Sequence, residues 1–141
     1  MRVCVIDGRG GGLGSRLIRR LLDVLDHQHD ILALATNEVA GAAMARAGAT
    51  RVEVGEAAIR RTVPNADLIL GSLSIVLSGA MLGEITPGIA DAVLQAPGRK
   101  LLLPLNRRGV EVVGTEFRTL ESLIDHVVRR VQSTLNSAVL T

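Results

Sequence analysis

The residues best suited to chemistry lie in a glycine-rich segment near the N-terminus. Residues 3–14 read VCVIDGRGGGLG, so that a strand-like apolar run ends at Asp7 and a glycine turn follows. Apolar residues then recur at helical spacing from Leu13 to Leu25. A strand, a glycine turn and a helix in this order present backbone N–H groups and a positive helix end to an anion. The turn is therefore expected to bind the phosphate of a nucleotide or dinucleotide through Gly8, Gly10, Gly11, Gly12 and Gly14.

The glycine spacing separates three phosphate-binding motifs. The dinucleotide pattern G-x-G-x-x-G would place its third glycine at Leu13, whereas the looser G-x-x-x-G-x-G fits Gly8, Gly12 and Gly14. A P-loop requires lysine after its last glycine, but Ser15 and Arg16 stand there, which disfavours P-loop hydrolysis of ATP. A turn that merely packs helix against strand is the alternative. We expect a positive φ at Gly12, so that valine there would be strained and would block the phosphate.

Asp7 has two interpretations, because a carboxylate beside a phosphate loop repels the phosphate. It accepts hydrogen bonds from the N–H groups of the loop and fixes the shape of the turn, which is the favoured interpretation. Alternatively, it holds Mg²⁺ between itself and a phosphate.

Further binding residues are expected where other parallel strands end, since ligands of such sheets lie beyond the carboxyl ends of the strands. The candidates are Thr36, Asn37, Gly71, Ser72, Asn106 and Arg107. A nicotinamide site would place an acid at Thr36–Asn37 to bind the ribose. Because that acid is missing and Glu38 comes one residue later, no strong preference for NAD over NADP is expected. Thr36 or Asn37 acting only as a helix cap, and a solvated turn at Arg107, are the alternatives.

Other reactive side chains are expected to have structural roles. Cys4 lies inside the first strand and is expected to be a buried apolar residue. His27 and His29 lie on a connection away from the site, so a solvated loop is favoured over a metal site. Glu84 precedes a helix and is expected to be solvated rather than part of the site.

Alternating apolar strands and helices predict one α/β domain with a Rossmann-like three-layer fold and a doubly wound, mainly parallel sheet. The expected strand order is 3-2-1-4-5 with a sixth strand, Val110–Gly114, at the edge. We expect the domain to span residues 1–135, followed by a weakly patterned C-terminal tail at 136–141. The other expected strands cover residues 3–6, 31–35, 51–54, 67–70 and 100–105, and the expected helices cover 13–25, 39–47, 56–62, 86–96 and 119–132.

Composition narrows the classes of partner. A net charge of +2 with scattered arginines, and an aromatic content of 1%, argue against nucleic-acid binding. No apolar run is long enough to span a bilayer and no signal peptide is evident, so a cytoplasmic protein is expected. Segments 74–82 and 127–140 carry more apolar positions than one covering face needs. This excess predicts an exposed patch and a homodimer.

The sequence resembles a family of small bacterial single-domain proteins catalogued as a domain of unknown function. The resemblance covers nearly the whole chain; its most specific parts are the V-I-D-G-x-G-G-G-x-G loop and the segment MLGEITP at 81–87. It implies a bacterial, stand-alone protein and no particular activity. The first strand–helix–strand unit also resembles short-chain reductases, whose chemistry needs a Tyr-x-x-x-Lys pair. This chain has no tyrosine, and its one lysine is Lys100.

The sequence therefore favours a protein that binds a nucleotide, with NAD(P) as one candidate cofactor and Mg²⁺ not favoured. Two alternatives remain open. One is a small oligomeric NAD(P)-dependent oxidoreductase whose site is shared between subunits, and the other is a non-catalytic structural or interaction protein.

Overall fold

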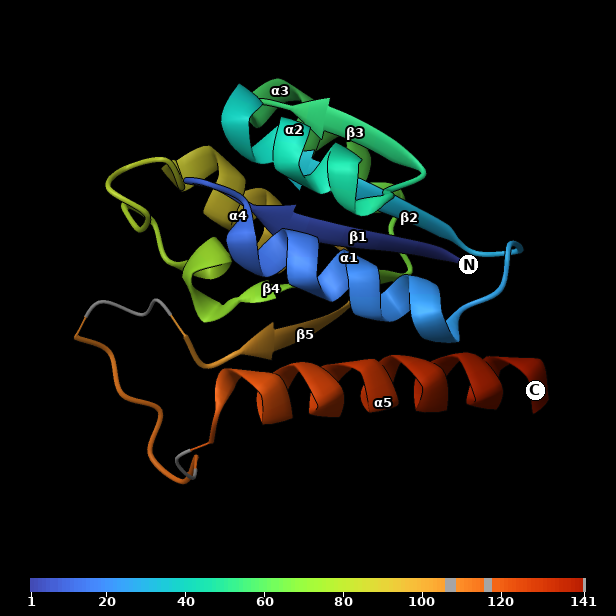
Figure 1. Cartoon of the computed structure of the whole chain (residues 1–141). Helices are drawn as coiled ribbons and strands as arrows, with labels where there is room; N and C mark the ends of the chain where they lie inside the picture. Colours follow the sequence, from blue (N-terminus) through green and yellow to red (C-terminus); the bar gives the residue numbers. More distant parts are fainter. Residues whose placement is uncertain (106–108, 116–117, 141) are drawn as a thin grey trace.

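A five-stranded parallel sheet forms the centre of the protein (Figure 1). The computed structural model describes residues 1–105, 109–115 and 118–140, without the side chains of 138–140. The sheet has the order β3-β2-β1-β4-β5, as predicted. Its strands are β1 (Arg2–Asp7), β2 (Asp30–Ala35), β3 (Arg51–Val54), β4 (Leu68–Ser72) and β5 (Arg99–Leu103). The chain reverses its direction across the sheet between β1 and β4, which is where such folds bind ligands.

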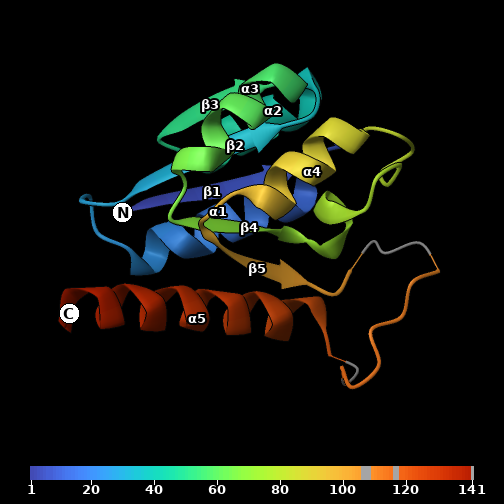
Figure 2. The same cartoon turned by 180° about the vertical axis from the view of Figure 1, so that it is seen from behind.

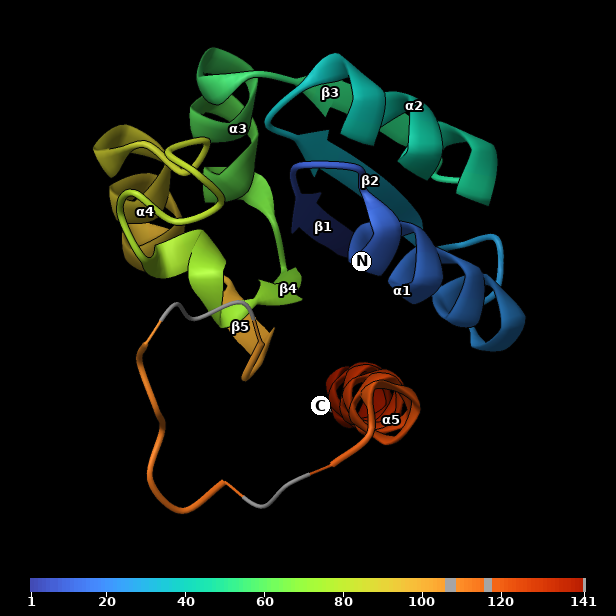
Figure 3. The same cartoon turned by 60° about the vertical axis from the view of Figure 1, so that its left-hand side comes forward.

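Helices cover both faces of the sheet, so the molecule has the three layers of a doubly wound fold (Figure 3). Helices α1 (Gly12–Val24), α2 (Glu38–Ala47) and α5 (Leu120–Leu140) cover one face. Helices α3 (Glu56–Thr62) and α4 (Pro87–Gln95) cover the other, together with the short 3₁₀ turns η1 (Val63–Asn65) and η2 (Leu73–Val76). The view from behind shows α4 in front of the sheet and α5 running below β5 (Figure 2).

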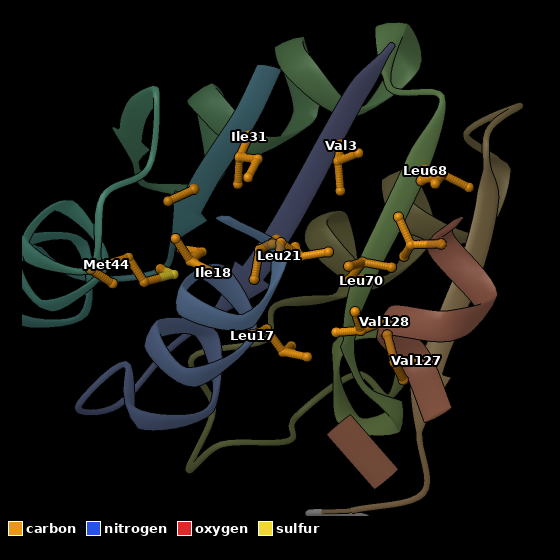
Figure 4. Close-up of a cluster of buried hydrophobic side chains, with 14 of the residues drawn as sticks. Val3, Leu17, Ile18, Leu21, Ile31, Met44, Leu68, Leu70, Val127 and Val128 are labelled. Atoms are coloured by element: carbon orange, nitrogen blue, oxygen red, sulfur yellow. The ribbon is translucent and has the colours of Figure 1, made fainter. Parts of the chain in front are cut away.

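Burial on both faces explains why the strands are continuous apolar runs. Val3 and Val5 of β1 point into the cluster under α1, whereas Cys4 and Ile6 belong to the cluster on the opposite face. This alternation follows from the two-residue period of a strand. Leu17, Ile18 and Leu21 of α1 lie over β1 and β4, next to Val127 and Val128 of α5 (Figure 4).

The predicted sixth strand is wrong. Residues 110–114 form no strand, and β5 is the edge of the sheet. Val110, Val112 and Val113 are exposed, and Val113 reaches 92% exposure, so these β-branched residues have no face to bury against. Strand propensity without packing is a weak signal. At the C-terminus, α5 continues to Leu140, through residues 136–140 that the sequence sets apart as a tail.

The predicted apolar patches are also not observed on the described residues. In segment 74–82, Ile75, Ala80 and Met81 are buried in the core, and Leu82 is the exposed large apolar residue. On α5, the apolar residues from Val127 to Leu135 pack against the sheet. The side chains of residues 138–140, which belong to the second segment, lie outside the described part of the chain. The homodimer therefore stays a prediction.

Within the described residues, no helix combines the length and apolarity needed to cross a membrane.

The packing of the core predicts that two helical leucines differ in how much they contribute to the free energy of unfolding. Leu17 on α1 is completely buried, whereas Leu94 on α4 is 58% exposed. Replacing Leu17 by alanine leaves a cavity and is expected to lower the free energy of unfolding by about 2–5 kcal/mol. The matched change Leu94→Ala is expected to stay within about 0.5 kcal/mol of wild type. Urea denaturation measures both, and equal losses would contradict the assignment of α1 to the core.

Candidate functional site

Three loops meet at the carboxyl ends of β1 and β2. They are the glycine turn after β1, the Thr36–Asn37 step after β2, and residues 77–86 between η2 and α4. The first and third lie at the same end of the sheet, on the left in Figure 1. Parallel strands place these ends together, so residues far apart in sequence share one edge of the fold.

Gly11 sets the course of the glycine turn. Its φ is 74°, it is the N-cap of α1, and a Cβ there would lie 2.8 Å from the carbonyl oxygen of Ala40. The positive φ predicted for Gly12 is therefore wrong, because Gly11 takes that conformation together with Arg9, whose φ is 51°. Gly14 lets α1 approach β1 closely, since a Cβ on it would lie 2.9 Å from that of Asp7 and 2.6 Å from the Met44 sulfur.

Asp7 joins both ends of the turn. Its Oδ1 accepts the N–H of Gly8 and its Oδ2 accepts the N–H of Gly14, each at 2.8 Å. Burial raises the pKa of the Asp7 carboxyl above its ordinary value of 3.8, and the Glu84 charge adds to the rise, whereas the Gly14 and Gly8 bonds oppose it. Both carboxylate oxygens are thus used to shape the loop, which supports the favoured interpretation of Asp7 over a Mg²⁺ ligand.

The turn lines a pocket of about 350 Å³. Its walls are residues 7–13 on one side and Met81 and Leu82 on the other. A Cβ built on Gly10 or Gly12 meets no atom within 4 Å, so both positions open into free space. Within the described chain, the N–H groups of Gly10, Gly12 and Leu13 have no acceptor. The pocket therefore combines unpaired backbone donors with an apolar wall.

The apolar wall is built in an uncommon backbone conformation. Gly79 and Gly83 have φ 89°, and between them Met81 and Leu82 have φ 55° and 56°. Left-handed conformations of bulky residues are unfavourable and concentrate at functional sites. Met81 is buried in the core, whereas Leu82 is 77% exposed at the pocket. The loop thus holds a large apolar side chain in solvent beside the glycine turn.

Glu84 ties the three loops together, so the expectation of a merely solvated residue is wrong. Its Oε1 accepts the Thr36 hydroxyl at 2.5 Å, the Asn37 amide at 2.7 Å and the Arg9 N–H at 3.0 Å. Burial raises the pKa of the carboxyl, but the bonds from Thr36, Arg9 and Asn37 and the Arg9 charge outweigh it. The pKa of Glu84 is consequently lower than its ordinary value of 4.5.

Thr36 and Asn37 are at the site, but with protein partners. The Asn37 side chain accepts the N–H of Ala40 at 2.8 Å, so Asn37 caps α2, but capping is not its only role. Its amide also donates to the Arg9 carbonyl at 3.1 Å. Gly8 is confined by the same group, because a Cβ on it would lie 2.5 Å from the Thr36 hydroxyl and 2.9 Å from Glu84 Oε1.

Two further predicted site residues, Gly71 and Ser72, are not brought to the pocket. Gly71 and Ser72 are the last residues of β4, and Ser72 is buried with its hydroxyl bonded to that of Ser74. Neither lines the glycine-turn pocket. Asn106 and Arg107 lie outside the described residues.

Cys4 and His29 lie away from the glycine-turn pocket. Cys4 is buried, and desolvation raises the pKa of its thiol to about 11, so it behaves as an apolar residue. His29 contacts the N-terminal amine and Asp26 at the opposite end of the sheet from the glycine turn. Among the described residues, no three His, Cys, Asp or Glu side chains are grouped as a metal site.

A second pocket of about 460 Å³ lies between β5 and α5, and it was not predicted from the sequence. Leucines of β5 and Leu123 and Val127 of α5 form its apolar part, and Arg118, His126 and Arg130 its polar part. One signal could have indicated this pocket: His126 and Arg130 are four residues apart, so they lie on the same face of α5.

Comparison with known proteins agrees with this architecture. The model of the family "Domain of unknown function (DUF3842)" matches residues 2–136, so the chain belongs to that family. No curated protein matches it. Among solved structures, the chain is similar to a dodecameric FMN-dependent UbiX-like decarboxylase from Escherichia coli O157:H7, at 15% identity and a TM-score of 0.51. The likeness covers 96% of this chain and 94% of that chain, and at this identity it shows the shared fold alone.

The Asp7 geometry predicts a loss of stability in Asp7→Asn. The amide of asparagine can accept only one of the two N–H groups and turns its own NH₂ toward the other. The free energy of unfolding is expected to fall by about 1–3 kcal/mol, the cost of a buried unsatisfied donor. Urea denaturation at neutral pH measures it. A gain in stability would mean that desolvation of the charge outweighs both bonds.

The hydrogen bonds of Glu84 predict that wild type and Glu84→Gln differ in the free energy of unfolding, and that this difference depends on pH. Because the pKa is lowered in the folded state, the carboxylate adds stability above its ordinary pKa of 4.5 and loses this contribution as pH falls through the folded-state value. Asp7, with its raised pKa, acts in the opposite direction and is present in both proteins. The stability advantage of wild type is expected near neutral pH and should shrink below pH 4.5. Chemical denaturation as a function of pH measures it, and a constant difference would contradict the assigned bonds.

Proposed function

We propose that this protein binds a nucleotide and that the glycine turn, residues 8–13, holds its phosphate. One observation carries the proposal. The unpaired N–H groups of Gly10, Gly12 and Leu13 belong to a pocket in which no side chain stands at positions 10 and 12. Donors of this kind at the N-terminus of a helix stabilise an anion.

The two nearby carboxylates are compatible with an anion at this place. Asp7 directs both oxygens to the N–H groups of Gly8 and Gly14, and Glu84 Oε1 accepts three donors. Charge that is hydrogen-bonded in this way is partly compensated within the loop. Arg9, exposed in the turn, adds a positive charge at the rim.

The apolar wall supports a ligand larger than phosphate alone. Leu82 is exposed beside the pocket and Met81 lines it as well, so a base or ring can pack there while the phosphate meets the backbone. The decarboxylase of similar fold depends on FMN, which is itself a phosphate-bearing nucleotide. This supports the nucleotide class. NAD(P) belongs to the same class of ligand and is included among the nucleotides tested below.

The test compares Gly12→Val with Ala57→Val. The first places a branched side chain at the start of α1, in the open space of the pocket. The second places the same side chain on the exposed first turn of α3, outside the pocket. Thermal unfolding with inorganic phosphate and a panel of nucleotides, FMN and NAD(P) measures binding. At a ligand concentration about 100 times Kd, the folded state gains about 2.7 kcal/mol.

Wild type and Ala57→Val are expected to be stabilised equally. Gly12→Val is expected to fold and to lose affinity by about tenfold or more, equivalent to about 1.4 kcal/mol. A folded Gly12→Val protein that binds every ligand as wild type does would place the site elsewhere.

A further inference from the structure

Glu84 lies against Thr36 and Asn37, the residues that follow β2, and dinucleotide-binding folds hold ribose at the end of this strand. In those folds an acid at the end of the second strand accepts the vicinal ribose hydroxyls, one step from the phosphate-binding turn. Here the second strand ends in Thr36 and Asn37, which are neutral. The carboxylate that lies against both of them comes from the loop before α4, 48 residues after Thr36.

The hydrogen bonds of Glu84 leave half of its carboxylate for a ligand. All three donors, from Thr36, Asn37 and the Arg9 N–H, converge on Oε1. In the part of the chain that the structure describes, Oε2 has no hydrogen-bond partner. Since the pKa of the carboxyl is lowered, Glu84 is ionised at neutral pH and is an acceptor only. A ribose supplies two hydroxyl donors for such a group.

The position relative to the pocket fits this use. Arg9, whose N–H binds Glu84, lines the pocket, as does Gly8, on which a Cβ would lie 2.9 Å from Glu84 Oε1. The carboxylate is therefore at the rim of the phosphate-binding turn, at the end of β2. We propose that Glu84 binds the 2′- and 3′-hydroxyls of a ribonucleotide whose phosphate lies on the glycine turn.

Two consequences for specificity follow. A 2′-phosphate would bring its charge against the Glu84 carboxylate, so NAD is expected to bind more tightly than NADP. A 2′-deoxy sugar would leave the carboxylate without one donor, so ribonucleotides are expected to bind more tightly than their deoxy counterparts. The absence of an acid at Thr36–Asn37 thus no longer implies indifference to the 2′-position, because the fold brings an acid there from another loop.

This inference rests on the proposed function, and the experiment separates the two. Calorimetry measures binding of inorganic phosphate, of the nucleoside diphosphates of the four RNA bases with their 2′-deoxy partners, and of NAD and NADP. The proteins are wild type, Glu84→Gln and Glu56→Gln. Glu56 is the matched control, because its carboxylate also accepts a threonine hydroxyl, from Thr86, and lies outside the pocket.

Wild type and Glu56→Gln are expected to prefer the ribose form of whichever nucleotide binds, and NAD over NADP, by about tenfold or more. In Glu84→Gln both ratios are expected to fall to about one, while inorganic phosphate binds as in wild type. A second readout needs no variant, since the Glu84 carboxyl resonance of wild type should shift with the ribonucleotide and less with its deoxy partner.

Equal binding of both sugar forms to wild type would overturn the role of Glu84 and leave the phosphate site intact. A ratio unchanged in Glu84→Gln would do the same. If no nucleotide binds, with or without binding of inorganic phosphate, the proposed function fails and this inference with it. Should Glu84→Gln not fold, an unmoved Glu84 resonance in the presence of bound ribonucleotide overturns the inference.

Discussion

The site depends on one buried carboxylate. Asp7 closes the glycine turn by binding the N–H groups of Gly8 and Gly14, which lie on either side of it. These two bonds fix where α1 begins relative to β1, and Gly14 permits the close approach they require. Asp7 takes up the donors at the two ends, Glu84 accepts the N–H of Arg9, and the Gly8 carbonyl accepts that of Gly11. The N–H groups of Gly10, Gly12 and Leu13 are left without acceptors. The loop thereby holds its shape without a ligand and keeps three N–H groups available for one.

Glu84 holds three different loops together, as Asp7 holds the two ends of one turn. It connects the turn after β1, the end of β2 and the loop before α4 through a single oxygen. The loop that carries Glu84 has bulky residues in left-handed conformations, and buried Met81 and Ile85 on either side anchor it in the core. Core packing of this kind can stabilise an unfavourable backbone. The result is a pocket with a polar backbone wall, an apolar side-chain wall and a carboxylate at its rim.

The fold was predictable because its signals are local. Apolar strand runs alternate with helices, which predicts a parallel sheet covered on both faces. The order 3-2-1-4-5 is the one that Rossmann-like sheets take. The glycine turn and the role of Asp7 could be predicted for the same reason. Which of the adjacent glycines has positive φ could not, since Gly10, Gly11 and Gly12 are alike in sequence and contact with Ala40 distinguishes Gly11. Glu84 could not be found either, because its bond to Arg9 spans 75 residues. Val110 and Val113 show the reverse error, a strand-like pattern without a partner.

The central claim is that the backbone of the glycine turn receives the phosphate. Backbone amide resonances of the labelled full-length chain, followed during titration with inorganic phosphate and then with a nucleotide, test it most directly. The account predicts that the amides of Gly10, Gly12 and Leu13 shift most and saturate together, while those of Gly8 and Gly14, already bonded to Asp7, shift less. Saturable shifts confined to the pocket between β5 and α5, with the amides of the turn unmoved, would contradict it.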